Sequence, residues 1–254
     1  MHMGDEQVVT REIRDNLAII TLNRPEKRNA LAKSIFVGLQ EAFTDIPESV
    51  DVVILTGNGD HFCAGLDLAE YKMSPAYEGM LYSRWGHKLF DSIQYCGRPV
   101  IAAMHGAVIG GGLELASCAH IRIADQTTFY QLPEGRRGIF LGGGGTVRIA
   151  RLIGVGRLTE IMLTGRRIEV DKGEQLGLSH YVVEPGKSME TALEIAENVA
   201  ANAKISNYMM LNALSMIEDM PAQAGLFTEA VAQALTLTSP DAQKGIDAFL
   251  TRNK

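Results

Sequence analysis

The sequence predicts an α/β fold in which strands and helices form layers, followed by a set of helices. Apolar runs of strand length alternate with segments of helical periodicity through the first half of the 254-residue chain, as in folds built from strand–helix units. From residue 155 onward, helical periodicity predominates. Hydrophobic residues make up 46% of the chain and charged residues 21%, so the chain can bury one large core with an appended subdomain.

The first elements are strands and amphipathic helices in alternation. Residues 8–22 alternate apolar and polar side chains around an Asp-Asn pair, which predicts a hairpin. Residues 32–43 carry apolar side chains at helical spacing, and residues 51–57, DVVILTG, predict a buried strand that ends in a turn. Residues 61–68, HFCAGLDL, form a loop of small residues. Residues 77–95 predict a longer helix that contains the single tryptophan.

A glycine cluster marks the centre of the chain. After a buried strand, PVIAAMH, come Gly110, Gly111 and Gly112, then a short apolar helix with one acid, Glu114, and a second strand. Glycines allow close backbone approach, and a helix N-terminus offers N–H groups and a positive dipole end. This composition predicts an oxyanion hole beside an acid/base group. Tight helix–strand packing with a solvated first-turn acid is the alternative explanation.

A second glycine-dense segment follows a short predicted strand at residues 128–130. Glu134 lies in this segment between Pro133 and Gly135. It is separated from Glu114 by a predicted strand and turn, so the two acids can converge on one cavity. Two carboxylates in one cavity can serve as base and acid. Each acid alone is more typical of a surface residue, and the interpretation depends on the pair.

The C-terminal part predicts successive helices. Residues 163–183 predict a helix between two short extended segments. Four further helices follow at residues 188–203, 206–218, 228–235 and 241–251. We therefore divide the chain into a core at 5–187, which contains the active site, and a helical region at 188–254. The apolar side chains of this region predict contact with a partner surface, although packing on the region's own core is the alternative.

Charge and cysteine content exclude several classes of function. The net charge of −6 and the lack of a basic block argue against a nucleic acid partner. Cys63, Cys96 and Cys118 lack metal-ligand spacing, which predicts free thiols, no metal site and a reducing, cytoplasmic location. No apolar run reaches the length of a membrane span. His61 and His105 flank the two loops of interest, and we expect structural hydrogen bonding from both.

The motifs together resemble the enoyl-CoA hydratase/isomerase family, the crotonase superfamily. The matching segments cover residues 8–252 and read NRPEKRNAL, HFCAGLDL, RPVIAAMHGAVIGGGLELASCAHIRIA, LPEGRRGIFLGGGGTVRIARLIG, LTGRRI and AFLTR. The resemblance implies a crotonase-like ββα spiral core with a C-terminal helical trimerisation region, and a homotrimer or homohexamer. It also implies an acyl-CoA substrate, with coenzyme A as part of the substrate and no separate cofactor.

The resemblance also assigns roles to individual residues. It places the two oxyanion-hole amides at Ala64 and Gly111, and the two catalytic acids at Glu114 and Glu134. In the family assignment, Glu134 delivers a proton to C2 of an enoyl-CoA while Glu114 orients and deprotonates the attacking water. The presence of both acids favours hydration to a 3-hydroxyacyl-CoA. The family's coenzyme A contacts fall on Lys27, Arg28, Ala64, Asp67, Leu68, Phe249 and Arg252.

The loop after Glu134 departs from the family pattern. It reads GIFLGGGGT, with Leu141 where proline is usual and Gly143 where alanine is usual. These changes affect the expected acyl pocket and leave both acids in place. The identity of the acyl group therefore stays open. Three alternatives to simple hydration also stay open. They are double-bond isomerisation, a hydratase/lyase reaction on an unusual acyl-CoA such as methylthioacryloyl-CoA, and a non-catalytic binding protein with the same fold.

Overall fold

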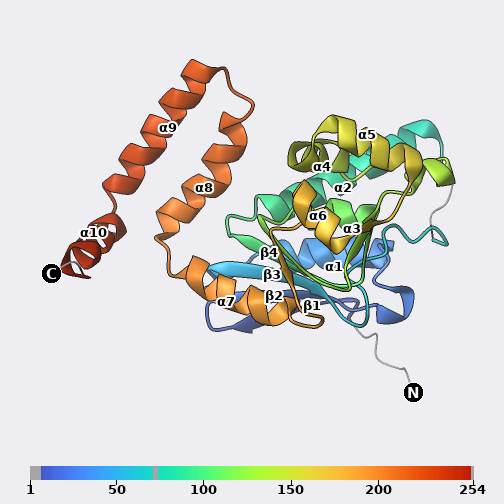
Figure 1. Ribbon diagram of the computed structural model, residues 1–254, viewed down its shortest axis with the longest axis horizontal. Helices are drawn as coiled ribbons and strands as arrows, with labels where there is room; N and C mark the ends of the chain where they lie inside the picture. Colours follow the sequence, from blue (N-terminus) through green and yellow to red (C-terminus); the bar gives the residue numbers. More distant parts are fainter. Residues whose placement is uncertain (1–6, 71–73, 253–254) are drawn as a thin grey trace.

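The computed structural model describes residues 7–70 and 74–252, without the side chains of residues 248, 249 and 252. Its main sheet has the strand order β1-β2-β3-β4-β6-β9, and Figure 1 labels the first four of these strands. These strands are β1 (Val9–Arg14), β2 (Leu17–Leu22), β3 (Val52–Gly57), β4 (Val100–Met104), β6 (Ile121–Asp125) and β9 (Tyr181–Val183). A smaller sheet contains β5 (Ala107–Ile109), β7 (Phe129–Gln131) and β8 (Ile168–Glu169).

The predicted hairpin is confirmed as β1 and β2, which pair antiparallel. Asp15 has a φ of 52° in the turn between them, a conformation that Asp tolerates better than most residues. The remaining strands of the main sheet pair in parallel, and helices connect most of them. The helices are α1 (Lys33–Phe43), α2 (Ala76–Gln94), α3 (Gly111–Ala116), α4 (Gly145–Ile153), α5 (Val155–Thr164), α6 (Val170–Leu176) and α7 (Ser188–Ala200), with 3-10 turns η1 (Pro25–Lys27) and η2 (Glu134–Arg137).

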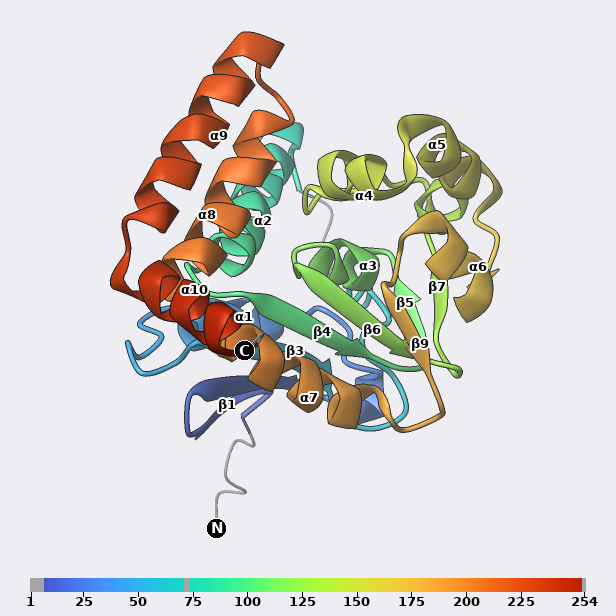
Figure 2. The ribbon, with the colours of Figure 1, turned by 60° about the vertical axis from the view of Figure 1, so that its left-hand side comes forward.

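Both faces of the main sheet are covered, which explains its almost continuously apolar strands. Within β3, Val52 and Ile54 pack toward α7, where Ala192 and Ala196 are fully buried. The alternate residues of β3 belong to the larger cluster on the opposite face, which includes α1, α2 and α3. Figure 2 shows α7 and α3 on opposite sides of the sheet. The N-terminus of α3 is thereby fixed on a rigid layer.

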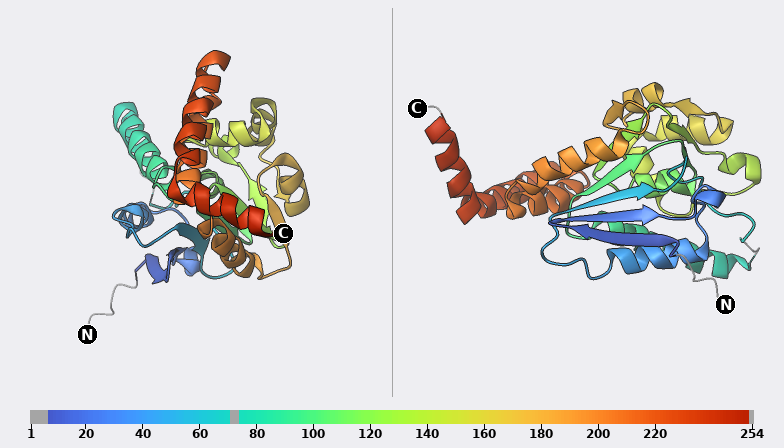
Figure 3. Two further views of the ribbon diagram at one scale, coloured as in Figure 1. Left: turned by 90° about the vertical axis from the view of Figure 1, so that its left-hand side faces the viewer. Right: turned by 90° about the horizontal axis from the view of Figure 1, so that it is seen from below.

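The last three helices extend away from the sheet. They are α8 (Lys204–Ile217), α9 (Ala222–Leu237) and α10 (Pro240–Arg252). α8 and α9 lie side by side as a projecting hairpin, and α10 continues from its end (Figures 1 and 3). α9 is longer than the predicted helix at 228–235 because it begins directly after Pro221, which occupies the N-cap. The boundary at residue 188 stays a prediction, and α7 directly after it packs on the sheet.

Candidate active site

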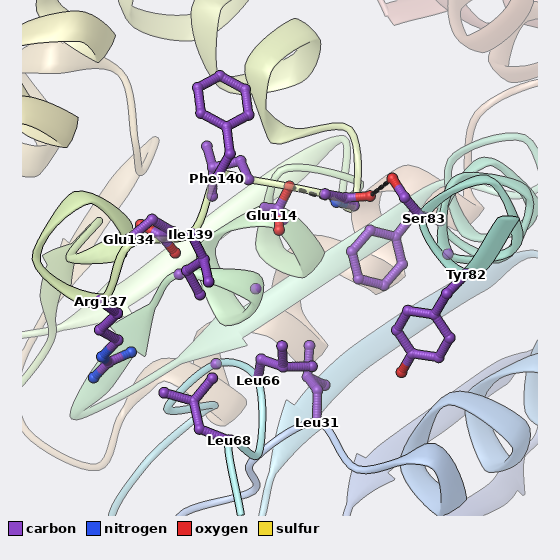
Figure 4. A pocket seen from close by; sticks show the side chains of 18 of the residues that line it. Leu31, Leu66, Leu68, Tyr82, Ser83, Glu114, Glu134, Arg137, Ile139 and Phe140 are labelled. Carbon is purple, nitrogen blue, oxygen red and sulfur yellow. Dashed lines mark hydrogen bonds between the residues drawn. The ribbon is translucent and has the colours of Figure 1, made fainter. Parts of the chain in front are cut away.

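A cavity of about 850 Å³, including its open mouth, lies where the predicted motifs meet. Its walls are α2, the start of α3, the loop at residues 65–68 and the loop at residues 137–143. Both predicted acids line it, and Figure 4 shows their carboxyl groups facing the same space. Most of the other lining side chains are apolar, which is typical of a ligand site with a few convergent polar groups. The folded chain therefore brings Glu114 and Glu134 together, as the sequence predicts.

Glu114 is held by backbone donors from the second glycine segment. Its Oε1 accepts hydrogen bonds from the N–H of Gly143 at 2.8 Å and of Gly145 at 2.9 Å. Burial raises the pKa of Glu114, while these two N–H groups and the charge of Arg148 act in the opposite direction. A Cβ on Gly145 would lie 2.6 Å from Cγ of Glu114, so glycine is required at that position. The carboxyl group is thus fixed at the wall of the cavity, which Glu114 lines.

Glu134 begins the η2 turn and has a different environment. Its carboxyl group is buried, and Oε2 has no hydrogen-bond partner in the described part of the chain. The pKa of Glu134 is raised to about 7, mainly by burial and also by the charge of Glu114, while Arg137 acts in the opposite direction. A Cβ on Gly110, which has a φ of 52°, would lie 2.5 Å from Oε1 of Glu134. Gly110 therefore leaves room for an acid that is readily protonated near neutral pH.

Gly111 lines the cavity as predicted, but the prediction for Ala64 as an oxyanion donor is wrong. The N–H of Ala64 donates to the carbonyl oxygen of Arg28 at 3.0 Å, and Ala64 does not line the cavity. Leu66, two residues later, does line it. In the part of the chain that the structure describes, the N–H groups of Leu66 and Gly111 have no hydrogen-bond acceptor.

The backbone pairing explains why Leu66 replaces Ala64. Leu31 pairs with Leu66 in a parallel bridge, in which Leu31 N–H donates to Gly65 and Asp67 N–H donates to Leu31. In such a bridge, the N–H of the middle residue points to the opposite side. A Cβ on Gly111 would lie 3.6 Å from the amide nitrogen of Leu66. The Leu66 and Gly111 amides therefore lie close together at the cavity.

The predicted coenzyme A contacts are only partly gathered at this site. Leu68 is exposed at the cavity, where Figure 4 shows it near Leu66. Asp67 accepts a hydrogen bond from Nη1 of Arg24 at 2.7 Å, which gives it a structural role in addition to any ligand contact. Lys27 and Arg28 are exposed on and just after η1. These four assignments, and that of Ala64, remain predictions, as do Phe249 and Arg252, whose side chains lie outside the described residues.

The remaining polar residues that the sequence singled out have structural roles or none. Nδ1 of His61 accepts the N–H of Ala107 at 3.1 Å, and Nε2 of His105 lies 2.9 Å from the carbonyl oxygen of Gly59. The three cysteines are free, with Cys63 and Cys118 buried. Among the described residues, no three His, Cys, Asp or Glu side chains are grouped to hold a metal. No helix of the described chain has both the length and the apolarity needed to cross a bilayer.

Comparisons with known proteins show which family and which solved structures this chain resembles. The sequence model of the family described as "Enoyl-CoA hydratase/isomerase" matches residues 12–254. The short-chain-enoyl-CoA hydratase of Clostridium acetobutylicum is 33% identical over 241 residues, which are 94% of this chain and 92% of that protein. A solved structure from Rhodopseudomonas palustris has 45% identity and a TM-score of 0.95 over 100% of this chain and 98% of that chain. Another solved structure, from Thermobifida fusca in complex with CoA, has 26% identity and a TM-score of 0.85 over 91% of this chain and 93% of that chain.

Proposed function

The chain belongs to the enoyl-CoA hydratase/isomerase family, and we propose that it adds water reversibly across the 2,3 double bond of an enoyl-CoA to give a 3-hydroxyacyl-CoA. The observation that carries this proposal is the convergence of Glu114 and Glu134 on a cavity that also contains two free backbone N–H groups. The family's crotonase-like α/β fold is confirmed by the high structural similarity to solved relatives. The trimerisation role of the C-terminal helices stays a proposal.

We propose that the thioester oxygen binds at the amides of Leu66 and Gly111. When water attacks C3, electrons of the double bond move toward the thioester, and negative charge develops on this oxygen. N–H donors fixed in a largely apolar cavity stabilise that charge more in the transition state than in the ground state. Gly111 is the first residue of α3, so the positive end of a short helix faces the same oxygen. This pair replaces the pair of Ala64 and Gly111 that the resemblance suggested.

The two acids divide the proton transfers. Glu114, whose carboxylate accepts two backbone N–H bonds, removes a proton from the water as its oxygen bonds to C3. Glu134, with a pKa raised to about 7, gives its proton to C2. Water supplies the hydroxyl group, and the step leaves Glu114 protonated and Glu134 ionised. Transfer of one proton from Glu114 back to Glu134 restores both acids, so the net change is the addition of H2O and no oxidant or reductant is needed. We propose no cofactor apart from the coenzyme A of the substrate, and a cytoplasmic location.

A panel of acyl-CoA thioesters tests the reaction. Hydration removes the conjugated double bond, so we expect a loss of enoyl-thioester absorbance with crotonyl-CoA or another 2-enoyl-CoA. The panel includes a 3-enoyl-CoA, which detects isomerisation, and methylthioacryloyl-CoA, whose hydration and cleavage would release a thiol. The proposal would be overturned if the protein, with native folding verified by circular dichroism, hydrated none of the 2-enoyl-CoA thioesters in the panel.

Replacement of Gly111 by Pro tests the oxyanion hole against a close control, Gly111→Ala. Proline is tolerated at the first helical position, and both variants add a Cβ that would lie 2.9 Å from Cδ1 of Leu31. Only Gly111→Pro removes the N–H. Loss of one such donor typically lowers kcat about 10²–10³-fold, and we expect this difference between the two variants. Equal kcat values in well-folded Gly111→Pro and Gly111→Ala would contradict the role of this amide.

We also propose that the C-terminal helices assemble the protein into a homotrimer or homohexamer. No described residue of α8 is buried, and Phe227 on α9 is 72% exposed. The other large exposed apolar side chains on these helices are Tyr208, Met210, Leu214, Met216, Leu226, Val231, Leu235, Leu237, Ile246 and Leu250. Monomeric proteins rarely expose an apolar surface of this extent, and the family resemblance favours copies of the same chain as partners.

The assembly has two separate readouts. Light scattering at micromolar concentration should give the mass of three or six chains, and a monomer would contradict the proposed assembly. A chain that ends before Asp241 lacks Phe249 and Arg252 and should bind CoA more weakly in calorimetry. Unchanged CoA affinity in that truncated chain would refute the CoA contacts at these two residues. It would not bear on the proposal that the protein forms an oligomer.

A further inference from the structure

Arg148 on α4 joins the end of α2 to the loop that holds Glu114. Its Nε donates to Oε1 of Gln94 at 2.7 Å, and its Nη2 donates to Asp91. Its Nη1 donates to the carbonyl oxygen of Gly143 at 3.1 Å. The side chain of Arg148 is only 10% exposed. A guanidinium with several partners in fixed directions is held in a single orientation.

The contact with Gly143 connects Arg148 to the catalytic base. Gly143 accepts from Arg148 through its carbonyl and donates to Glu114 through its N–H. A Cβ on the next residue, Gly144, would lie 2.4 Å from Nη1 of Arg148, and Gly144 has a φ of 97°. The guanidinium therefore packs directly against the turn. Beyond this turn, Gly145 supplies the second N–H to Glu114.

Arg148 also changes the charge environment of Glu114. Its positive charge lowers the pKa of Glu114 and so opposes the effect of burial. The other titratable or charged groups around Glu114 are Glu134 and Arg137 on η2, His87 and Asp91 on α2, and Cys118 just after α3. Asp91 is paired with Arg148 itself, and Arg137 lowers the pKa of the other acid, Glu134. Arg148 thus distinguishes the two carboxyl groups electrostatically.

We propose that Arg148 is a positioning residue for Glu114. It holds residues 143–145 so that two N–H groups fix Oε1, and it supplies a positive charge that favours the carboxylate form of the base. The inference rests on the proposed function, because a base is needed only if Glu114 accepts a proton from water. It adds a residue that acts through Glu114 and does not touch the substrate.

Three variants separate charge from geometry. Arg148→Met removes both the charge and the bonds. We expect kcat to fall by the order of 10²-fold, since small misplacements of a catalytic group have effects of this size, with little change in KM. The acidic limb of its kcat–pH profile should move to higher pH, because Glu114 loses a stabilising cation. Arg148→Lys keeps the charge without the directed bonds, so kcat should fall while the limb stays near its native position.

Arg151→Met is the matched control. Arg151 lies one turn further along α4, where it pairs with Asp219 and Glu218 near α8, so the variant removes the same charge from the same helix without touching the loop. It should retain the native kcat and pH limb. A native kcat and an unmoved acidic limb in Arg148→Met would overturn the inference, as would equal changes in Arg148→Met and Arg151→Met. If Arg148→Met does not fold, Asp91→Asn serves in its place, because it removes an anchor of Arg148. A native kcat in both Asp91→Asn and Arg148→Lys would then overturn the inference.

A second readout does not depend on turnover. Amide hydrogen exchange of a peptide that covers residues 139–149 should be faster in Arg148→Met than in the native protein and in Arg151→Met. If the native protein hydrates no enoyl-CoA in the panel, the proposed function fails, but this exchange difference still tests the positioning. Equal exchange in all three proteins would overturn the positioning of the loop by Arg148.

Discussion

Replacement of Glu134 by Gln is expected to lower kcat for hydration about 10²–10⁴-fold, the usual effect of losing a positioned acid/base group. Glutamine fits the same space but has no proton to give to C2. In the native protein, the pKa of Glu134 is raised to about 7, so the hydration rate should fall as the pH rises above about 7. Measurement of kcat from pH 5 to 9 with the best substrate of the panel checks both expectations. This basic limb should be absent from the residual activity of Glu134→Gln.

Thermal stability provides an independent check on Glu134. The folded-state pKa, about 7, lies above the ordinary value of 4.5, so the stability linked to the protonated acid is complete below pH 4.5 and is lost as the pH rises through 7. Glu134→Gln should therefore match the native melting temperature near pH 4 and exceed it near pH 9. Glu169→Gln, at an exposed acid, is the control. A native kcat or an unchanged basic limb in Glu134→Gln would exclude Glu134 as the proton donor.

Replacement of Glu114 by Gln is expected to lower kcat by a similar factor, about 10²–10⁴-fold. The amide oxygen of glutamine can still accept the N–H groups of Gly143 and Gly145, so the loop should keep its geometry. The variant lacks a base for the attacking water. The acidic limb of the native kcat–pH profile, which reports deprotonation of this base, should therefore disappear in Glu114→Gln.

Binding and folding measurements separate chemistry from structure in Glu114→Gln. Calorimetry with butyryl-CoA, which has no double bond to hydrate, should give the native affinity, and circular dichroism should give a folded spectrum. Hydration at the native rate would contradict the role of Glu114. Loss of the basic limb in Glu114→Gln, with loss of the acidic limb in Glu134→Gln, would show that the roles of the two acids are reversed.

The sequence by itself predicted the parts of this protein that depend on local pattern. Alternation predicted the β1–β2 hairpin, and apolar runs predicted β3 and β4, because strands buried on both faces admit few polar residues. The glycines around Glu114 and Glu134 were informative because each acid needs a neighbour without a side chain. The Cβ contacts that would form at Gly110 and Gly145 show this directly. The motifs also identified the family before any geometry was known.

Tertiary structure decided which groups are free to act. Ala64 and Leu66 lie two residues apart in one short loop, yet only Leu66 keeps a free N–H in the described structure. That outcome depends on the positive φ of Gly65, 90°, and on pairing with residues more than thirty positions earlier in the chain. In the sequence alone, Arg148 is likewise no different from an ordinary charged residue on the surface of a helix. Its contact with the Glu114 loop exists only because α2, α3 and α4 pack together, and sequence spacing does not encode a long-range contact of this kind.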